Sequence, residues 1–235
     1  MYDVRVDPEI FEKYPGYAVL VIYASGVANG PSNEVSIEAL RAAEASAHEE
    51  FGDGKPATHP HIAAWREAYR SFGSKPSKFL CSVEALLSRT LKGNDLPPIN
   101  AVVDLYNAVS IRHVLPVGGE DRDRLTSDLV LKIADGSEQF EAMSAGEIES
   151  VSVDPGEVVF ADSSGVTCRR WNWRQCARTQ LVPDSTNMYF VLDSLAPFTR
   201  QQLQAAGDEL VAGLRALSPD CVIEQFVVSG PDAPG

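Results

Sequence analysis

Cysteine and histidine are scarce in this sequence, and neither forms a pattern typical of a metal site. The four cysteines (Cys81, Cys168, Cys176 and Cys221) are scattered without a Cys-x-x-Cys pair. The four histidines do not complete a set of metal ligands either. The sequence therefore predicts reduced, structural thiols and no metal.

The motifs of several common enzyme classes are also absent. The chain has no Gly-x-x-x-x-Gly-Lys phosphate loop, no Gly-x-Gly-x-x-Gly dinucleotide fingerprint, no Gly-x-Ser-x-Gly elbow and no His-Glu-x-x-His zinc motif. These absences argue against an NTPase, a dehydrogenase, a serine hydrolase or a zinc protease of a standard kind. We expect no cofactor.

Long apolar runs are missing as well. A helix that spans a bilayer needs roughly 20 apolar residues, and no run in this chain approaches that length. The first residues, Met1 to Val6, have neither the basic start nor the apolar stretch of a signal peptide. From these two features we expect a cytoplasmic protein with no membrane partner.

The overall composition is that of a globular protein with an acidic balance. The 235 residues are 44% hydrophobic and 23% charged, which is enough to bury a substantial core. The net charge of −13 repels the phosphate backbone of nucleic acids at long range. Any nucleic-acid partner must therefore be bound at a defined local site.

One segment departs from this acidic balance. Residues 163–183 contain no acidic residue but four arginines, Arg169, Arg170, Arg174 and Arg178, so this segment carries +4 and the remainder of the chain −17. Arginine donates forked hydrogen bonds to phosphate or carboxylate groups. We expect Arg169, Arg170 and Arg178 to contact RNA.

The arginines are interleaved with tryptophan and asparagine over Val166 to Arg174, which we predict to be a strand. Alternate residues of a strand point to opposite faces, so Trp171 and Trp173 would lie on one face and Asn172 on the other. An edge strand protected by charge would have a similar composition. The density of arginine and tryptophan favours a strand that faces a ligand, because an indole ring stacks on a base, a sugar or a cation.

A second polar pattern lies on the predicted helix Ile99 to His113. At 100° per residue, Asn100, Asp104 and Asn107 fall within about 60° of one another, and apolar residues fill the opposite side. An ordinary amphipathic helix is the alternative. Solvated helix faces are usually built from Lys, Glu and Gln, however, because Asn and Asp disfavour helix interiors. The short polar side chains therefore favour the wall of a polar cavity.

The rest of the chain reads as helices followed by hairpins, without repeats. Predicted helices cover a short segment from Asp7 to before Pro15, then Glu34–Phe51, His61–Phe72, Ser82–Leu91 with Ser82 as N-cap, and Phe198–Leu217. Predicted strands cover residues 2–6, Tyr17–Tyr23, Asp128–Ala134, Gln139–Met143, Glu157–Ala161, Asn187–Leu192 and Cys221–Val228. Turns at Asp135-Gly136 and at residues 162–165 predict two hairpins.

The helix pattern resembles a known family signature. Residues 98–107, Pro-Ile-Asn-Ala-Val-Val-Asp-Leu-Tyr-Asn, closely resemble the "INxVVDxxN" signature of the B3/B4 domain, the aminoacyl-tRNA editing module inserted in the β subunit of bacterial phenylalanyl-tRNA synthetase. The likeness continues through Pro116, residues 156–162 and the strand that holds Asp193, and it covers roughly residues 82–195. The motif Trp171 to Arg174 is more similar to freestanding B3/B4 proteins.

The resemblance implies an α+β fold, in which helices pack on mixed and antiparallel sheets in layers. We expect residues 1–235 to form a single B3/B4-like domain, with a helical and mixed part over about 1–125 and a β-rich part over about 126–235. The chain departs from the synthetase module at several pocket positions. Pro97 replaces an arginine, Tyr106 a threonine, Gly118 a histidine and Asp193 a glutamate, so we expect a rebuilt amino-acid pocket.

The resemblance also implies an activity, the hydrolysis of the ester that joins a wrong amino acid to the 3′ end of a mischarged tRNA. We assign catalytic roles to Asn107 and Asp104, which would hold the terminal adenosine or the attacking water, and to Arg174, which with Asn172 would contact the carbonyl or a phosphate. Such esters are activated, so positioned water and hydrogen-bond donors suffice.

The remaining candidates are expected to bind substrate. Trp171 or Trp173 would stack, and Asp121, Asp162 and Asp193 would bind an α-ammonium group or a cationic side chain. Asn100, Tyr106 and Ser110 complete the predicted set. A guanidinium-like side chain suits several carboxylates beside aromatic rings, and within the freestanding branch this resembles deacylases that clear canavanine from arginine tRNA.

Two other classes of function stay open. One is a noncatalytic module that binds tRNA and leaves the ester intact. The other is a small-molecule enzyme or binding protein on the same fold, for which the acidic surface is an argument. Binding of a free metabolite without binding of tRNA would distinguish the second from the first.

Overall fold

The structure is a computed structural model that describes residues 2–144 and 146–234. Its helices are α1 (Pro8–Lys13), α2 (Glu34–Phe51), α3 (Pro60–Ser71), α4 (Ser82–Thr90), α5 (Ala101–His113) and α6 (Arg200–Leu217), with 3₁₀ turns at Pro56–Thr58 and Arg122–Arg124. Its strands are β1 (Val4–Val6), β2 (Ala18–Ser25), β3 (Val117–Asp121), β4 (Leu129–Ile133), β5 (Gln139–Ser144), β6 (Glu147–Ser152), β7 (Val158–Asp162), β8 (Gly165–Arg169), β9 (Arg174–Gln175), β10 (Met188–Ser194) and β11 (Val222–Ser229).

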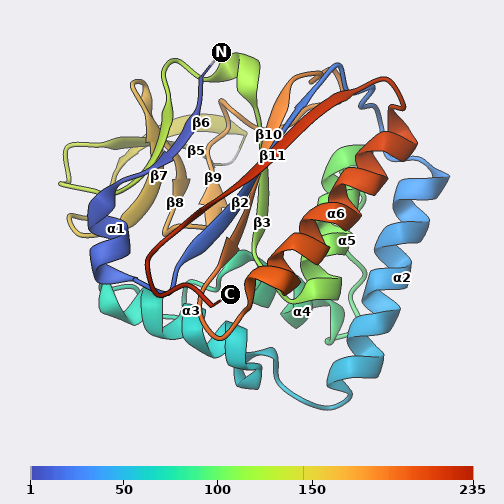
Figure 1. Cartoon of the computed structure of the whole chain (residues 1–235), viewed down its shortest axis with the longest axis horizontal. Helices are drawn as coiled ribbons and strands as arrows, with labels where there is room; N and C mark the ends of the chain where they lie inside the picture. Colours follow the sequence, from blue (N-terminus) through green and yellow to red (C-terminus); the bar gives the residue numbers. More distant parts are fainter. Residues whose placement is uncertain (1, 145, 235) are drawn as a thin grey trace.

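The strands form two sheets (Figure 1). The first has the order β1-β4-β7-β8-β5-β6, with β9 paired to β8, and it is mixed because β1 runs parallel to β4 and β5 runs parallel to β8. The second has the order β11-β2-β10-β3 and is antiparallel. The fold is therefore α+β, as predicted.

The second sheet separates two hydrophobic cores. Along β2, Leu20 and Ile22 join the core beneath α5 and α6, whereas Val19 and Val21 join the core on the opposite face. This division follows from the two-residue period of a strand. Figure 1 shows α6, α5 and α2 together on one side of this sheet.

Helix α6 lies very close to the second sheet at Gly207. A Cβ atom at this position would come within 2.0 Å of Leu20 Cδ2, so only glycine allows the observed approach. The close packing brings Leu203 and Leu210 of α6 into full burial against the sheet.

Most predicted elements are present with small changes at their ends. Helix α2 has the predicted bounds, and β7 and β8 form the predicted hairpin across residues 162–165. The predicted N-cap Ser82 is wrong, because Cys81 takes the N-cap position without a side-chain hydrogen bond. Both sheets combine strands from either side of residue 125, and the single-domain description of residues 1–235 stays a prediction.

The predicted strand Val166–Arg174 is wrong in its second half. It is a hairpin in which Arg169 of β8 pairs with Arg174 of β9, and residues 170–173 form the connecting loop. Arg170 and Trp171 have φ angles of 47° and 67°, a region that residues other than glycine rarely occupy. The predicted alternation of faces therefore does not apply.

Burial of Trp171 explains how this loop is held. The indole is fully buried and packs edge-on against Tyr14, Tyr17 and Trp65, with ring centroids 4.8, 4.9 and 5.1 Å away. Burying an aromatic ring of this size outweighs the cost of a left-handed backbone, which is about 1–2 kcal/mol per residue.

Two further expectations about the strands differ from the structure. The turn at Asp135-Gly136 does not join a hairpin, because β4 pairs with β1 and β7 while β5 pairs with β6 and β8. Strands β3 and β6 were not predicted. Every residue of β6 is exposed, so it lacks the alternation that identifies a strand, and β3 begins Val-Gly-Gly, which is typical of a turn.

Within the part of the chain that the structure describes, no helix is long and apolar enough to cross a membrane.

Candidate functional site

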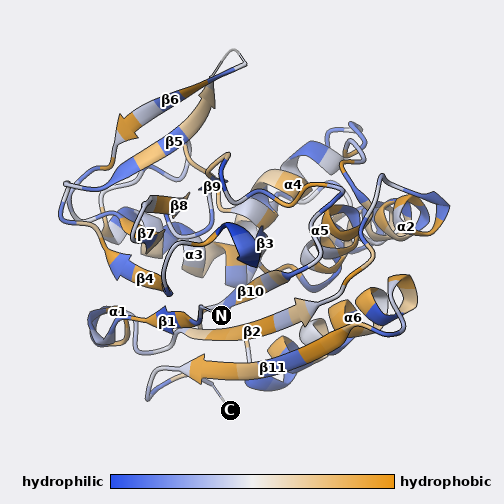
Figure 2. Ribbon diagram, turned by 90° about the horizontal axis from the view of Figure 1, so that it is seen from above, coloured by the Kyte–Doolittle hydropathy of each residue, from blue (hydrophilic) through white to orange (hydrophobic). Residues whose placement is uncertain are grey.

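A cavity of about 260 Å³ opens where the two sheets meet helices α4 and α5. Figure 2 shows strand β3 between β8 and β9 on one side and α4 and α5 on the other. The lining residues come from α4 (Ser82, Ala85, Leu86), α5 (Tyr106, Asn107), β3 (Val117, Gly118, Glu120), β7 and β8 (Phe160, Cys168), the loop and β9 (Trp171, Asn172, Trp173, Arg174, Gln175) and β10 (Tyr189, Val191, Asp193).

Strands β3 and β10 form the floor of this cavity. Glu120 pairs with Tyr189, and Gly118 pairs with Val191. Gly118 has no side chain, and a Cβ atom there would lie 3.4 Å from Gln175 Nε2 and 3.6 Å from Val191 Cγ2. Asp193 lies four residues beyond Tyr189 on the same face of β10, a backbone distance of about 13 Å. The floor thus carries one carboxyl group toward each end.

Asp193 is buried among neutral hydrogen-bond donors. Its carboxylate accepts hydrogen bonds from the Tyr17 hydroxyl at 2.6 Å and from Asn172 Nδ2 at 3.4 Å. Tyr69 donates to the Asn172 carbonyl oxygen at 2.9 Å and so orients this amide. Burial raises the pKa of Asp193 to about 7, and the hydrogen bonds from Tyr17 and Asn172 only partly oppose this effect.

Glu120 has a similar environment at the other end of the floor. It is 3% exposed and accepts a hydrogen bond from the Thr179 hydroxyl at 2.6 Å. Burial raises the pKa of Glu120 to about 7, against the opposing effects of neighbouring hydroxyl groups and of the positive charge of Arg178. No pattern in the sequence singles out Glu120, which stands beside Asp121, Arg122 and Asp123; only the pairing of β3 with β10 turns its side chain into the cavity.

The upper walls of the cavity carry hydrogen-bond donors. Asn107 is half-buried on α5, and the exposed Arg174 donates from Nη2 to the backbone oxygen of Met143 at 2.8 Å. The structure brings together seven of the predicted residues, namely Tyr106, Asn107, Trp171, Asn172, Trp173, Arg174 and Asp193. Helix α5 and the segment of residues 171–175 are therefore two walls of one cavity.

Comparison with known proteins agrees with the signature at residues 98–107. Residues 64–212 match the model of the B3/4 domain. This chain belongs to the B3/4 domain family. Over 95 residues it is 28% identical to the phenylalanine–tRNA ligase beta subunit of Mycoplasma genitalium, a match that covers 40% of this chain and 11% of that protein.

The fold of this B3/4 domain is also found in a solved structure. An N-terminal fragment of the phenylalanyl-tRNA synthetase beta-subunit from Pyrococcus horikoshii superposes with a TM-score of 0.52 at 10% sequence identity. The match covers 97% of this chain and 54% of that fragment. This chain therefore spans only part of the length of the relatives that it matches.

Two residues of the predicted polar stripe on α5 lie outside the cavity of the B3/4 domain. Asp104 is fully buried and accepts hydrogen bonds from the backbone N–H of Ile99 and from the hydroxyl of Ser36, both at 2.9 Å. Asn100 caps α5 through the Val103 N–H at 3.0 Å. These side chains hold the start of the helix, so the stripe lines the cavity only at Asn107.

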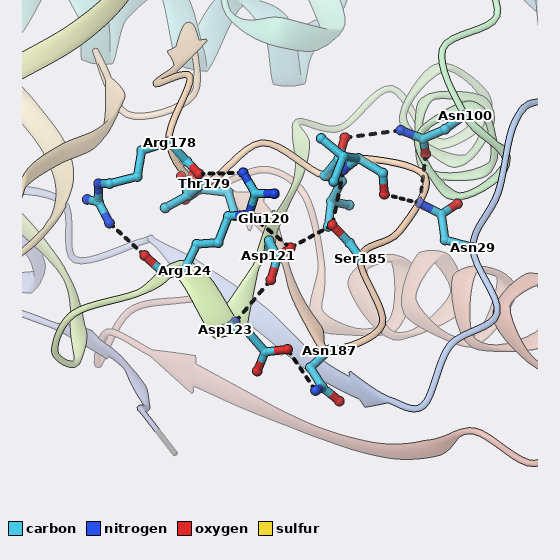
Figure 3. Close-up of polar contacts among 12 residues, drawn as sticks. Asn29, Asn100, Glu120, Asp121, Asp123, Arg124, Arg178, Thr179, Ser185 and Asn187 are labelled. Carbon is cyan, nitrogen blue, oxygen red and sulfur yellow. Dashed lines mark hydrogen bonds and ion pairs between the residues drawn. The ribbon is translucent and has the colours of Figure 1, made fainter.

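Three other predicted substrate-binding residues also have structural partners. Ser110 donates to the backbone oxygen of Leu115 at 2.7 Å. Asp121 accepts a hydrogen bond from the Ser185 hydroxyl at 2.6 Å, in a network beside Asn100 that Figure 3 shows. Asp162 forms an ion pair with Arg178 at 2.7 Å. None of the three is among the residues that line the cavity.

The arginines assigned to RNA contacts are occupied within the chain. Arg169 is buried and forms a forked ion pair with Glu157, at 2.9 and 2.7 Å. Arg170 stacks between Phe79 and Trp173, with its Cζ atom 3.8 and 4.7 Å from the ring centroids. Arg178 is paired with Asp162. Three of the four arginines in residues 163–183 therefore have partners inside the chain.

No group of three or more His, Cys, Asp or Glu side chains in residues 2–144 and 146–234 is placed to hold a metal ion. All four cysteines are free and buried. Burial raises the pKa of Cys168, a cavity residue, well above the usual value, so its thiol is a poor nucleophile.

Proposed function

We propose that this B3/4 domain is a trans-editing aminoacyl-tRNA deacylase, which binds the 3′ end of a mischarged tRNA in the cavity and hydrolyses its ester. The observation that carries the proposal is a cavity with two buried carboxyl groups, Asp193 and Glu120, that have only neutral hydrogen-bond partners among the described residues. The family membership and the likeness to phenylalanine–tRNA ligase beta subunits support it.

Asp193 is the proposed binding residue for the α-ammonium group of the amino acid. A buried carboxylate without a cationic partner is disfavoured, and this is why burial raises the pKa of Asp193 to about 7. A bound ammonium group supplies the missing positive charge. Tyr17 and Asn172 fix the orientation of the carboxylate, so the carbonyl of the ester would lie beside the donors of the loop.

The presence of two carboxyl groups on the floor supports a substrate with two cationic groups. Besides the α-ammonium group, a cationic side chain such as the guanidino group of arginine or canavanine would supply the second charge. Canavanyl-tRNA(Arg) is our leading proposal for the substrate.

The chemical step requires little from the protein. A water molecule attacks the ester carbonyl, the C–O bond to the terminal ribose breaks, and a proton from the water passes to the ribose oxygen. A rate increase of ~10³-fold corresponds to about 4 kcal/mol. Asn107 and Arg174 are the donors proposed to position the water and stabilise the oxyanion, and Trp173 offers a ring face for the terminal adenosine.

A panel of mischarged tRNAs tests this function directly. The protein is incubated with canavanyl-, arginyl- and tyrosyl-tRNA, and release of the amino acid is followed. We expect canavanyl-tRNA(Arg) to lose its amino acid fastest. If every ester in the panel stays intact, the proposed deacylase activity is contradicted. Binding of tRNA without hydrolysis would indicate a noncatalytic tRNA-binding module.

The two carboxyl groups on the cavity floor also favour a second candidate, a binding protein for a free cationic amino acid. Calorimetry with free arginine and canavanine distinguishes it from the deacylase. Saturable binding of the free amino acid, together with no measurable binding of tRNA, would favour this alternative.

A further inference from the structure

A second hollow lies beside the cavity, at the end of helix α3. It has a volume of about 390 Å³ and is lined by Arg66 and Arg70 of α3 and by the loop residues 73–77. This loop, Gly-Ser-Lys-Pro-Ser, connects α3 to α4, and α4 provides part of the wall of the cavity. We call this hollow the basic groove.

The charges in the basic groove are all positive. Arg66, Arg70 and Lys75 are its ionisable lining residues, in a chain whose net charge is −13. Arg66 is paired with the buried Glu84 at 2.6 Å, so Arg70 and Lys75 are the cations that the groove offers to a ligand. Arg70 and Lys75 are exposed. The ion pair of Arg70 with Glu67 lies on the surface, and exposed pairs of this kind contribute little free energy, so a phosphate can replace the glutamate.

Two contacts connect the basic groove to the cavity. The buried hydroxyl of Ser74 in the groove accepts a hydrogen bond from Arg170 Nε at 3.1 Å. Phe79, just beyond the groove, packs edge-on against Trp173 with the ring centroids 4.9 Å apart, and Trp173 lines the cavity. These contacts place the loop of the groove against the loop of residues 170–173, whose Trp173 lines the cavity.

We propose that the basic groove binds backbone phosphates of the tRNA whose aminoacyl end enters the cavity. This inference rests on the proposed function and adds the path of the polynucleotide, which Arg169, Arg170 and Arg178 cannot provide because they are paired inside the chain. Arginine forks, a lysine and serine hydroxyls are the groups that proteins use to contact phosphate without reading sequence.

The double variant Arg70→Glu/Lys75→Glu tests the groove, and Lys55→Glu/Lys92→Glu is its matched control. The control has the same change of charge at two exposed lysines that line neither hollow. Affinity for uncharged tRNA is measured by filter binding over a range of salt concentrations, and hydrolysis is measured with aminoacyl-tRNA and with the methyl ester of the same amino acid.

We expect the groove variant to lose at least tenfold in tRNA affinity at low salt and to lower the slope of log K against log salt by about 1.5, the contribution of two phosphate contacts. Its turnover of the methyl ester should stay within twofold of the wild type, and the control should keep its tRNA affinity. Equal losses in both variants, or an unchanged slope in the groove variant, would overturn the inference.

The arms of the experiment separate this inference from the proposed function. If tRNA binds through the groove but no ester is hydrolysed, the proposed phosphate site is supported and the deacylase activity is contradicted. If esters are hydrolysed while the groove variant binds tRNA normally, the deacylase activity is supported and the phosphate site is contradicted. Displacement of tRNA by inorganic phosphate at constant ionic strength would show a site for a free anion and would also overturn the inference.

Discussion

The cavity floor and the β8–β9 hairpin both bury charged side chains, but only the hairpin provides each buried charge with its opposite. Arg169 is held by Glu157 at 2.7 Å, and Arg170 lies 3.6 Å from the same carboxylate. Asp193 and Glu120 have neutral partners instead, and burial raises the pKa of each carboxyl group to about 7. The ion pairs of the hairpin stabilise the fold. The carboxyl groups of Asp193 and Glu120 have no counter-ion within the chain, which suits them to bind a cationic ligand.

The difference shows why a cluster of charges in a sequence is a weak guide to a binding site. The four arginines of residues 163–183 are its most prominent feature, yet only Arg174 lines the cavity. The two acidic residues of the floor stand apart in the sequence and have no distinctive neighbours. Buried carboxyl groups without a counter-ion, rather than charge density, mark the candidate site.

The largest effect is expected from Glu157→Gln, which removes the counter-ion of the buried Arg169. Breaking a buried ion pair on one side costs about 3–5 kcal/mol, because the remaining charge is left without compensation. Urea denaturation measures the loss in unfolding free energy. The control Glu149→Gln, at an exposed position of β6, should change it by less than about 0.5 kcal/mol. A loss of unfolding free energy below about 1 kcal/mol for Glu157→Gln would show that the hairpin does not depend on the pairing of its buried charge.

Asp193→Asn tests the cavity floor through the pH dependence of the unfolding free energy. The folded protein holds the Asp193 proton up to a pKa of about 7, against an ordinary value of 3.8, so it binds more protons than the unfolded chain between these values. This contribution to stability is fully present below the ordinary pKa and is lost as the pH rises through about 7.

The wild type should therefore lose up to about 4 kcal/mol of unfolding free energy relative to Asp193→Asn between pH 4 and pH 8. Thermal or urea unfolding at a series of pH values provides the measurement. Asp184→Asn, at an exposed position, is the reference variant. If the difference in unfolding free energy between wild type and Asp193→Asn stays constant from pH 4 to pH 8, Asp193 carries no unpaired buried charge.

Asn107→Ala and Arg174→Ala probe the donors above the floor. We expect each to slow deacylation at least tenfold, which corresponds to about 1.4 kcal/mol of transition-state stabilisation, while the unfolding midpoint stays that of the wild type. Asn94→Ala, at an exposed position, should leave the rate unchanged. Unchanged turnover in the Asn107 and Arg174 variants would remove both residues from the proposed mechanism.

The smallest effect is expected from Arg178→Ala. Its partner Asp162 has a buried side chain but keeps hydrogen bonds from the backbone N–H groups of Thr126 and Ser164, at 2.9 and 3.0 Å, while the Arg178 side chain is 22% exposed. We expect a loss of about 1 kcal/mol or less and no change in tRNA affinity. A tenfold loss of tRNA affinity would instead support the RNA-binding role predicted from the sequence.

Local patterns in the sequence predicted most of the helices and the family. The apolar period and the capping residues define α2 and α6 within two residues, because these signals act over a few neighbouring positions. The signature at residues 98–107 identified the B3/4 domain, and it located Asn107 on the cavity wall. The interpretation of Asn100 and Asp104 failed because a capping side chain and a cavity-lining side chain have the same chemistry in a sequence.

The sequence by itself determined the apolar strands, the amphipathic helices and the residue types available for a site, since these depend on local composition and period. Only the tertiary structure decided which charges find a partner. Pairing of β3 with β10 turned Glu120 and Asp193 into one cavity, and the burial of Trp171 bent the arginine segment into a loop whose charges meet Glu157. Such contacts join residues far apart in the chain, and no local pattern encodes them.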